Sequence, residues 1–307
     1  MSYQSTITWL MDADPAIRWQ VLRDLLDADP AAVQAERAQV AHTGWGAQLL
    51  SQQTERGDWQ GDDLSLLRTI HCVVLLMDLG VDPMDRLVQT MLERVSTLRW
   101  EYHGRRLFFD GEVEPCMNAK VLATGSYFGI RCEQVLQRLL GEQLADGGWN
   151  CDAPPSTRSS FHTTIAVLEG LQRYEKAFGG SADTQSARQR GEEYLLERRL
   201  LYRLSTGEII DKAWTRFHFP PSWHYDALRG LEYMRAAGRK PEARMEEAIG
   251  FVRLRRHQNG RWPLVKPYKD DLLKFDMETQ VGAASRWNTL RAMRVLRWYE
   301  SGSQTLT

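Results

Sequence analysis

The segment Gln143-Leu144-Ala145-Asp146-Gly147-Gly148-Trp149-Asn150-Cys151-Asp152 separates two stretches of different character. The stretch before it is charged and amphipathic, and the stretch that begins near Phe161 is largely apolar. Paired glycines suit a tight turn because they adopt backbone conformations that other residues avoid. An amphipathic helix followed by a more apolar one forms a helical hairpin when the second helix is buried on several sides. The segment therefore predicts the turn of such a hairpin.

The same pattern of glutamine, a short gap, glycine and tryptophan occurs twice more. It recurs at Gln53…Gly57-Asp58-Trp59 and at Gln258-Asn259-Gly260-Arg261-Trp262. Its tryptophans lie 90 and 113 residues apart, each about twice a helical-hairpin repeat of about 40–50 residues. Degenerate copies at 102–110 and 206–214 fill the two gaps. The chain is therefore predicted to repeat one hairpin unit along its length.

Hydrophobic periodicity divides the predicted helices into two classes. Amphipathic helices are expected at 33–53, 85–99, 133–144, 187–203 and 242–257. Helices apolar on more than one side, and hence buried, are expected at 15–26, 64–79, 116–128, 161–174, 223–237 and 284–299. Six buried helices alternating with outer ones predict an all-α fold, an (α/α)6 barrel or toroid. We expect a single domain over 1–307, with the helices of 1–40 closing the ring and 300–307 as a tail. An open solenoid of helix pairs has the same period and is the alternative.

Composition narrows the classes of function. The net charge of −1 provides no field to attract nucleic acid. The longest apolar run, near Cys72–Met77, is too short to cross a bilayer, so no transmembrane segment is expected. Four cysteines in a chain without an apolar leader at its N-terminus indicate reduced thiols and a cytoplasmic location.

The glutamine–tryptophan repeats resemble those of the terpenoid cyclase and protein prenyltransferase superfamily. Pro115-Cys116, Asp146-Gly147-Gly148-Trp149 and Phe219-Pro220…His224-Tyr225-Asp226 also resemble a group of bacterial single-barrel relatives without assigned activity. The resemblance implies a barrel cavity that binds an apolar, isoprenoid-like ligand. The Asp-x-Asp-Asp acid of class II cyclases is missing, as is the Asp-Asp-x-x-Asp motif that chelates magnesium. The acidic pairs Asp62-Asp63 and Asp270-Asp271, and Asp12-x-Asp14, are interpreted as helix caps or solvated loop charges.

Two short motifs resemble the zinc ligands of protein prenyltransferase β-subunits. Glu114-Pro115-Cys116 is similar to their Asp-x-Cys, with glutamate in place of aspartate, and Phe161-His162-Thr163 is similar to their Tyr-His-Thr. The resemblance implies a zinc ion held by Cys116 and His162, with Glu114 as a weaker ligand and Cys151 as a second thiolate. Cys116, His162 and Glu114 would be three protein ligands, which leave one zinc position open, as catalytic zinc requires. The alternatives are a helix start with proline at its first position, a small buried cysteine and a hydrogen-bonded histidine.

A third set of candidates precedes and opens the later buried helices. His224 and Asp226, with His162, are candidate acid–base residues, although Asp226 also suits the start of a helix. Trp214, Phe217, Trp223 and Tyr225 form an aromatic group with Phe219, and Arg286-Trp287 opens the last buried helix. These residues are candidates for binding a prenyl chain, because aromatic faces stabilise cationic carbon. The alternative is that they are core residues.

Three functions remain open from the sequence. The first is a transferase or cyclase that acts on prenyl substrates, and the second is a non-catalytic binding or scaffold barrel. The third is a sugar-active (α/α)6 enzyme, which needs paired carboxylates about 5–9.5 Å apart. Asp152 with Asp226 is the pair available for it.

Overall fold

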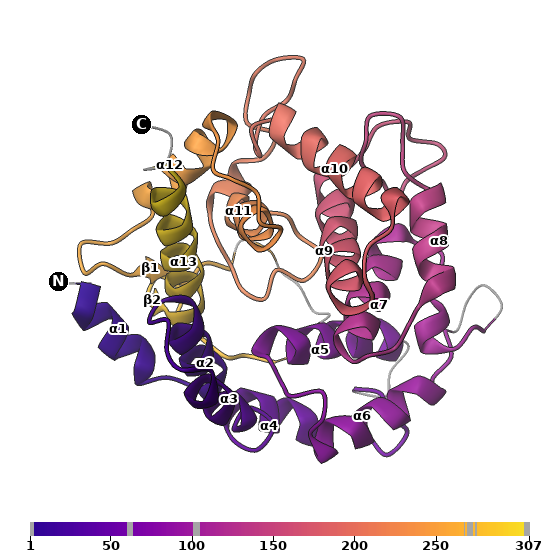
Figure 1. The fold of residues 1–307 in the computed structure, drawn as a ribbon, viewed down its shortest axis with the longest axis horizontal. Coiled ribbons are helices and arrows are strands. Elements are labelled where there is room, and N and C mark those ends of the chain that lie inside the picture. The colour runs from indigo at the N-terminus through magenta and orange to yellow at the C-terminus, as the bar shows by residue number, and fades with distance from the viewer. Residues whose placement is uncertain are drawn as a thin grey trace. The chain divides into compact units, whose positions relative to one another are not determined.

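A computed structural model describes residues 3–59, 64–100, 105–266, 268, 273 and 275–303. These residues form thirteen α-helices and one sheet of two-residue strands, β1 (Trp262–Pro263) and β2 (Ala284–Ser285), paired antiparallel. The helices are α1 (Tyr3–Met11), α2 (Pro15–Asp24), α3 (Pro30–Ala38), α4 (Gly44–Ser51), α5 (Ser65–Leu79), α6 (Arg86–Thr97), α7 (Pro115–Tyr127), α8 (Glu133–Gly141), α9 (Phe161–Phe178), α10 (Ala182–Glu197), α11 (Ala227–Ala236), α12 (Glu246–Leu254) and α13 (Arg286–Ser303) (Figure 1). The predicted all-α fold class is confirmed.

The chain forms two compact units. Unit 1 contains Met1–Trp45, Leu195–Pro221 and Tyr225–Thr307, and unit 2 contains Gly46–Tyr194 and Ser222–His224. Each unit holds three of the six predicted buried helices. In unit 2 these are α5, α7 and α9, and in unit 1 they are α2, α11 and α13.

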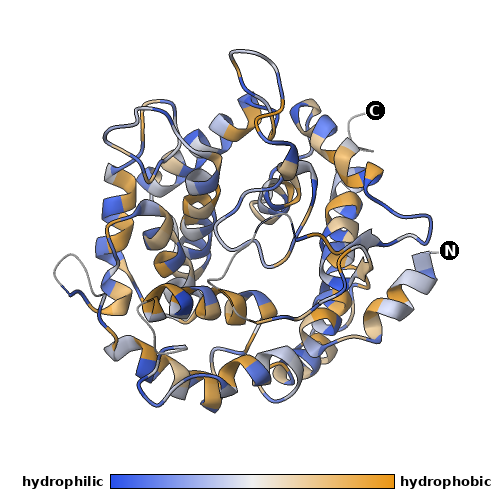
Figure 2. Cartoon of the chain, turned by 180° about the vertical axis from the view of Figure 1, so that it is seen from behind, coloured by the Kyte–Doolittle hydropathy of each residue, from blue (hydrophilic) through white to orange (hydrophobic). Residues whose placement is uncertain are grey.

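In unit 2, α7 lies between α5 and α9 and contacts both (Figure 1). Eleven of the thirteen residues of α7 are buried, whereas only four of the twelve residues of α6 are, which confirms the two classes of helix. Figure 2 shows helices that carry hydrophilic and hydrophobic colours around one circumference, as amphipathic helices do. The backbones of α7 and α9 approach closely. A Cβ atom at Gly170 would lie 2.8 Å from the carbonyl oxygen of Ala119.

In unit 1, α13 lies between α11 and α2 and contacts both. The buried helix α2 begins at Pro15, and the carboxylate of Asp14 accepts a hydrogen bond from the N–H of Ala16 at 2.9 Å. This is the cap predicted for the acidic pair at 12–14. The other two acidic pairs, at 62–63 and 270–271, lie outside the described residues, as do part of the degenerate repeat at 102–110 and the end of the 300–307 tail.

The three repeat tryptophans occupy equivalent positions. Each indole N–H donates to the carbonyl ten residues earlier in the preceding amphipathic helix, at 2.9 Å for Trp59, 2.7 Å for Trp149 and 2.7 Å for Trp262. Each backbone N–H of these tryptophans donates to the hydroxyl of a threonine on the following buried helix. These are Thr69, Thr164 and Thr289. All three tryptophans are buried. The repeat therefore joins the two helices of each hairpin by hydrogen bonds inside the core.

The repeat glutamines join neighbouring hairpins. The side-chain amide of Gln143 donates to the carbonyls of Gly147 and Ala187, and that of Gln53 donates to Gly57 and Met91. Ala187 belongs to α10 and Met91 to α6, so each glutamine connects its own turn to the next amphipathic helix.

Two local predictions differ from the structure. The helix expected over 33–53 is two helices, because α3 ends at Ala38 and α4 begins at Gly44, whose φ of 68° is not helical. The helix expected from 223 begins at Ala227, and Asp226 caps it by accepting the N–H of Arg229 at 2.8 Å. Ser160 precedes α9 without a side-chain cap, and the neighbouring Ser159 is bonded to Asp146 in the glycine turn.

No α-helix within the described residues is long and apolar enough to span a membrane.

Candidate functional site

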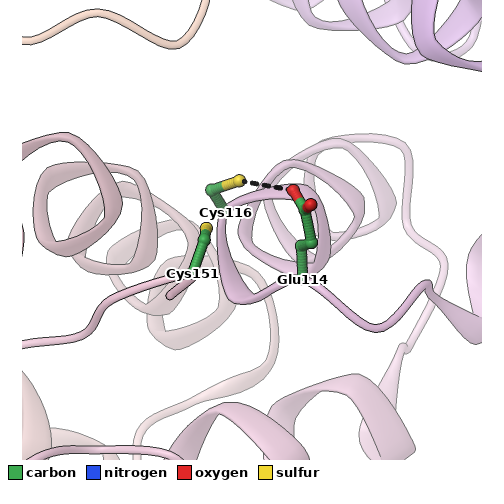
Figure 3. Close-up of side chains that lie close together, drawn as sticks. All are labelled: Glu114, Cys116 and Cys151. Carbon is green, nitrogen blue, oxygen red and sulfur yellow. Dashed lines mark hydrogen bonds between the residues drawn. The ribbon is translucent and has the colours of Figure 1, made fainter. Parts of the chain in front are cut away.

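Glu114, Cys116 and Cys151 come together in unit 2. One ligand atom of each residue lies within 4.8 Å of the other two (Figure 3). Glu114 and Cys116 lie at the start of α7, and Cys151 lies in the turn before α9. The carboxylate is exposed and both thiols are partly exposed, so the group is accessible to solvent. The structure therefore brings together three of the four residues that the zinc resemblance nominated.

The start of α7 is held in place by a buried amide. Asn118 donates from its side-chain nitrogen to the carbonyl of Glu112 at 2.9 Å, and its side-chain oxygen accepts the Glu112 N–H at 2.8 Å. The carboxylate of Glu112 in turn accepts the N–H groups of Val113 and Glu114. Pro115 occupies the first turn, where its missing N–H loses no helical hydrogen bond. These bonds fix the backbone that carries Glu114 and Cys116.

The position of Cys151 is set by Thr163 on α9. The Cys151 N–H donates to the Thr163 hydroxyl at 3.3 Å, and that hydroxyl donates to Cys151 Sγ at 3.4 Å. The amide of Asn150 closes the turn by donating to Ser156 and to the carbonyl of Arg158. Cys151 is therefore joined to the same α9 whose partner helix, α7, carries the other two residues.

The two thiols share a hydrogen bond that separates their pKa values. A hydrogen bond from Cys116, aided by the one from Thr163, lowers the pKa of Cys151 to about 7 despite burial. The same bond to Cys151, followed by burial, raises the pKa of Cys116 well above its usual range. The Cys116 thiol also lies 3.5 Å from Glu114 Oε2. The Cys116 thiol thus lies between a second sulfur and a carboxylate oxygen, both of which can accept its proton.

A buried lysine lies one helical turn after Cys116. Lys120 Nζ is 2.6 Å from His71 Nε2 on α5, and His71 Nδ1 is 2.6 Å from the carbonyl of Leu67. A carbonyl only accepts hydrogen bonds, so His71 Nδ1 carries the proton and Nε2 accepts from the lysine ammonium. The charge of Lys120 favours the thiolate of Cys116, opposing the larger effects of Cys151 and burial.

The donor set fits Zn²⁺. Thiolate sulfur and carboxylate oxygen are its preferred ligands, and two sulfurs at the usual Zn–S distance of about 2.3 Å are about 3.8 Å apart in a tetrahedron. A group whose ligand atoms already lie within 4.8 Å reaches that geometry through small side-chain rotations. Three protein ligands would leave the fourth position for water or a substrate atom.

His162 is not part of this group of three. Its ring lies 5.2 Å from the ring of Trp223 and 6.0 Å from that of His224, measured between centroids, and Trp223 and His224 are themselves 3.8 Å apart. Trp223 is 42% exposed, whereas His224 is buried. The three rings form an aromatic cluster in unit 2. The catalytic roles of His162 and His224 stay predictions.

In unit 1, Asp226 is paired with a histidine that the sequence did not single out. His218 Nδ1 lies 3.4 Å from Asp226 Oδ2, and the Tyr268 ring lies 5.3 Å from the His218 ring. Burial opposes ionisation of Asp226, but His218, Arg291 and the Arg229 N–H together hold its pKa below the usual range. Burial, with the nearby charges of Asp211 and Asp226, raises the pKa of Tyr268 to about 12. Asp226 is thus an ionised helix cap and a partner for imidazole.

Most of the other predicted binding residues are buried in unit 1. The rings of Trp214 and Tyr225 are 4.9 Å apart, and the Tyr225 hydroxyl donates to the Leu200 carbonyl. Trp287 stacks on Phe219 at 4.1 Å, and Phe217 is 3% exposed. Arg286 donates to the carbonyl of Trp9 and lies over its ring. These contacts are those of core residues, and a role in ligand binding stays a prediction.

Sequence reasoning missed Thr163, Asn118, Lys120 and His218. A hydroxyl or amide residue in a helix gives no local sign that it binds a distant turn. Thr164 and Thr69 do repeat after the tryptophan motifs, but their spacing of 15 and 10 residues from the tryptophan varies with turn length. The weak signal in these cases is a polar residue in an otherwise apolar helix, because a buried polar group needs a partner.

Comparison with known proteins yields solved structures only. No protein-family model and no curated protein matches the chain. A protein from Actinoplanes is 17% identical, with 97% of this chain and 100% of that chain covered at a TM-score of 0.44. The type II terpene cyclase MstE from Scytonema, in its apo form, is 16% identical, with 94% of this chain and 87% of that chain covered at a TM-score of 0.48. A substituted form of MstE in complex with geranylgeranyl dihydroxybenzoate, its substrate, is 15% identical over the same shares at a TM-score of 0.44.

The pKa of Cys151 gives a testable reactivity. In metal-free protein, alkylation of Cys151 by iodoacetamide is expected to accelerate with rising pH around a midpoint near pH 7, because the thiolate is the nucleophile. Cys72 and Cys132, whose pKa values are raised to about 12 by burial, should stay unmodified over the same range. Peptide mass spectrometry of timed samples measures each site separately.

Thr163→Val is the matched variant, since it removes the hydroxyl but keeps the size of the side chain. It should move the Cys151 midpoint upward. A wild-type midpoint near 9, the ordinary thiol value, contradicts the proposed stabilisation of the Cys151 thiolate.

Proposed function

We propose that this protein binds Zn²⁺ through Glu114, Cys116 and Cys151 and acts on an apolar, isoprenoid-like substrate as a transferase. The observation that carries the proposal is the convergence of two thiols and a carboxylate, from two segments of the sequence, within 4.8 Å. A bound Zn²⁺ supplies a Lewis acid that lowers the pKa of a thiol or water in its open position. The glutamine–tryptophan repeats and the Glu114-Pro115-Cys116 motif, which resemble those of protein prenyltransferases, support the substrate class.

Two neighbouring residues assist deprotonation of the thiols, although the hydrogen bond to Cys151 and burial keep the pKa of Cys116 above its usual range. Thr163 donates to Cys151 Sγ and holds this thiolate toward α7. The Lys120 ammonium, oriented by His71, stabilises negative charge on Cys116. Two thiolates, one carboxylate and one ammonium sum to a net charge of about −2, which matches a dication. Also in unit 2, the partly exposed ring of Trp223, which lies against His162, would offer an apolar surface for a prenyl chain.

Metal content tests the site directly. Protein purified without chelators and analysed by inductively coupled plasma mass spectrometry is expected to contain one zinc per chain. Cys116→Ala and Cys151→Ala should lose it, because each removes a ligand. Glu114→Gln should bind zinc about 10-fold or more weakly. Cys72→Ala and Cys132→Ala, at buried cysteines outside the group, are the matched controls and should retain the metal. Equal zinc content in all five variants would contradict the proposed site.

Activity is tested with geranylgeranyl diphosphate and a small thiol such as dithiothreitol. In the expected reaction, the sulfur–C1 bond forms, the C1–oxygen bond breaks, diphosphate leaves and the thiol proton passes to solvent. Zinc-loaded wild type should form the thioether, whereas Cys151→Ala should not. If wild type retains zinc but yields no thioether, hydrolysis or cyclisation product, the transferase proposal is contradicted. The function would then be that of a metal-binding scaffold.

A further inference from the structure

A cluster of four arginines lies in unit 1, far from the three zinc candidates in the sequence. Arg23 lies in the last turn of α2 and Arg235 in the last turn of α11. Arg291 and Arg294 lie on α13. Two carboxylates, Asp24 and Glu232, lie among them. The helices α2, α11 and α13 all belong to unit 1 and pack against one another through α13. The cluster therefore contains four positive and two negative side chains.

The two carboxylates are bound by three of the four arginines. Both oxygens of Glu232 are bound, one by Arg291 and the other by Arg294. Both oxygens of Asp24 accept from Arg23, at 2.7 and 2.9 Å. Asp24 also accepts from Arg294 at 3.3 Å. Among the described residues, none of the hydrogen bonds that these two carboxylates accept comes from the fourth arginine, Arg235.

Arg235 is the arginine of the cluster that has no carboxylate partner within the described residues. Among the described residues its guanidinium forms no ion pair and donates no hydrogen bond, although its Nε atom is buried. Burial, followed by repulsion from Arg294, lowers the pKa of this guanidinium. Arg235 is therefore a half-buried cation, with a buried Nε donor, that a bound anion would pair.

Helix dipoles do not remove the excess charge. The C-terminal ends of α2 and α11 each contribute about −0.5 elementary charge near Arg23 and Arg235. Against the excess of two positive charges, this leaves about one positive charge. Arg23 is 47% exposed at its side chain, so the cluster is open to solvent on that side. Arg235 lies about 14 Å from Asp226 along α11, at the 1.5 Å rise of a helix. Arg291 also acts on the Asp226 carboxylate, so the two groups share this arginine.

We propose that Arg235, together with the exposed edge of Arg23, binds a phosphate group of a small molecule or of a lipid headgroup. The planar fork of a guanidinium matches two oxygens of a phosphate, and a phosphate dianion neutralises the excess charge. Asp24 holds the guanidinium of Arg23 at the end of α2 and is itself bound by Arg294. This site is independent of the zinc ligands and of the proposed transferase activity.

Inorganic phosphate is the probe for the first test. Thermal unfolding is followed in phosphate and in chloride at equal ionic strength, and calorimetry measures the affinity. Phosphate is expected to raise the Tm of wild type. Arg235→Gln should bind phosphate about 10-fold or more weakly. In chloride, the same variant should be as stable as wild type or more so, because its guanidinium has no partner to lose and repels Arg294.

Arg297→Gln is the matched control. Arg297 lies on α13 close to the cluster but is paired with Asp27, so its removal should leave phosphate affinity within about twofold. The proposal is overturned if wild type gains no more stability from phosphate than from chloride. It is also overturned if Arg235→Gln binds phosphate as wild type does, or if Arg235→Gln unfolds at lower temperature in chloride.

Sedimentation with vesicles distinguishes the two sources of phosphate. The protein is mixed with phosphatidylcholine vesicles with and without phosphatidic acid. Wild type that pellets only with phosphatidic acid, while Arg235→Gln does not, assigns the site to a lipid headgroup. Phosphate binding in solution without pelleting assigns it to a soluble phosphate-bearing molecule. Pelleting that is equal for wild type and Arg235→Gln overturns the role of Arg235 in lipid binding.

Discussion

Trp149→Ala is expected to lower the free energy of unfolding by about 3–5 kcal/mol, the usual cost of truncating a fully buried aromatic residue. Trp149 is fully buried, and its indole N–H donates to the Leu139 carbonyl at 2.7 Å. Its backbone N–H donates to Thr164, so the residue joins α8 to α9. The substitution would leave a cavity and also an unpaired carbonyl at the end of α8. Urea unfolding followed by circular dichroism measures the difference.

Trp149→Phe separates the two contributions. It keeps much of the apolar area but removes the indole N–H, so its cost should be smaller, about 1–3 kcal/mol. Leu254→Ala, at a side chain that is 71% exposed, should change stability by less than about 0.5 kcal/mol. If Trp149→Ala unfolds at the same urea concentration as Leu254→Ala, the repeat tryptophan does not join the helices as described.

Glu232→Gln is the second substitution with a large expected effect. The Glu232 carboxylate is largely buried and binds Arg291 and Arg294 on α13, so its removal leaves two guanidiniums without their shared counterion. Breaking a buried ion pair in this way usually costs about 3–5 kcal/mol. Phosphate should restore part of the loss if the neighbouring anion site exists as proposed. Urea unfolding in chloride and in phosphate measures both effects.

The same carboxylate predicts a pH dependence. Burial opposes ionisation of Glu232, but Arg291 and Arg294 outweigh it and hold its pKa below the usual value. A lowered pKa in the folded state means that the stabilisation is fully present above the unfolded pKa of about 4.5 and is lost as the pH falls through the folded pKa. The difference in unfolding free energy between wild type and Glu232→Gln should therefore be constant from pH 6 to 8 and shrink below about pH 4.5. A difference that does not change with pH contradicts the ion-pair account.

The zinc candidates show which part of the site a local sequence motif predicts. Glu114-Pro115-Cys116 is continuous in sequence, and its place at a helix start follows from the proline. Cys151 lies in the turn before α9, and His162 lies in the first turn of α9. Cys151, and not His162, completes the group of three. The choice depends on the turn of Asn150 and on the Thr163 hydroxyl, which bring the Cys151 sulfur toward α7. Distances of this kind depend on loop conformation, which residue type alone does not specify.

His218 and Asp226 illustrate the same limit in unit 1. Asp226 is a recognisable helix cap, and its carboxylate accepts the Arg229 N–H. His218 lies in a loop whose path is fixed from α13, where Asn288 donates to the Phe217 carbonyl and Arg291 donates to the His218 carbonyl. These α13 residues are about 70 residues away in sequence. Nothing near His218 in the sequence indicates that pairing.

The sequence alone determined the helical class, the alternation of buried and amphipathic helices, and the repeat turns. It did so because periodic apolar residues, glycine turns and buried tryptophans act through neighbours within about ten to fifteen residues. Tertiary structure decided which polar residues meet: Cys116 with Cys151, Lys120 with His71, and His218 with Asp226. It also left Arg235 without a carboxylate. These pairings depend on the packing of whole helices, since a shift of one residue along a helix turns its side chain by about 100° and breaks the contact.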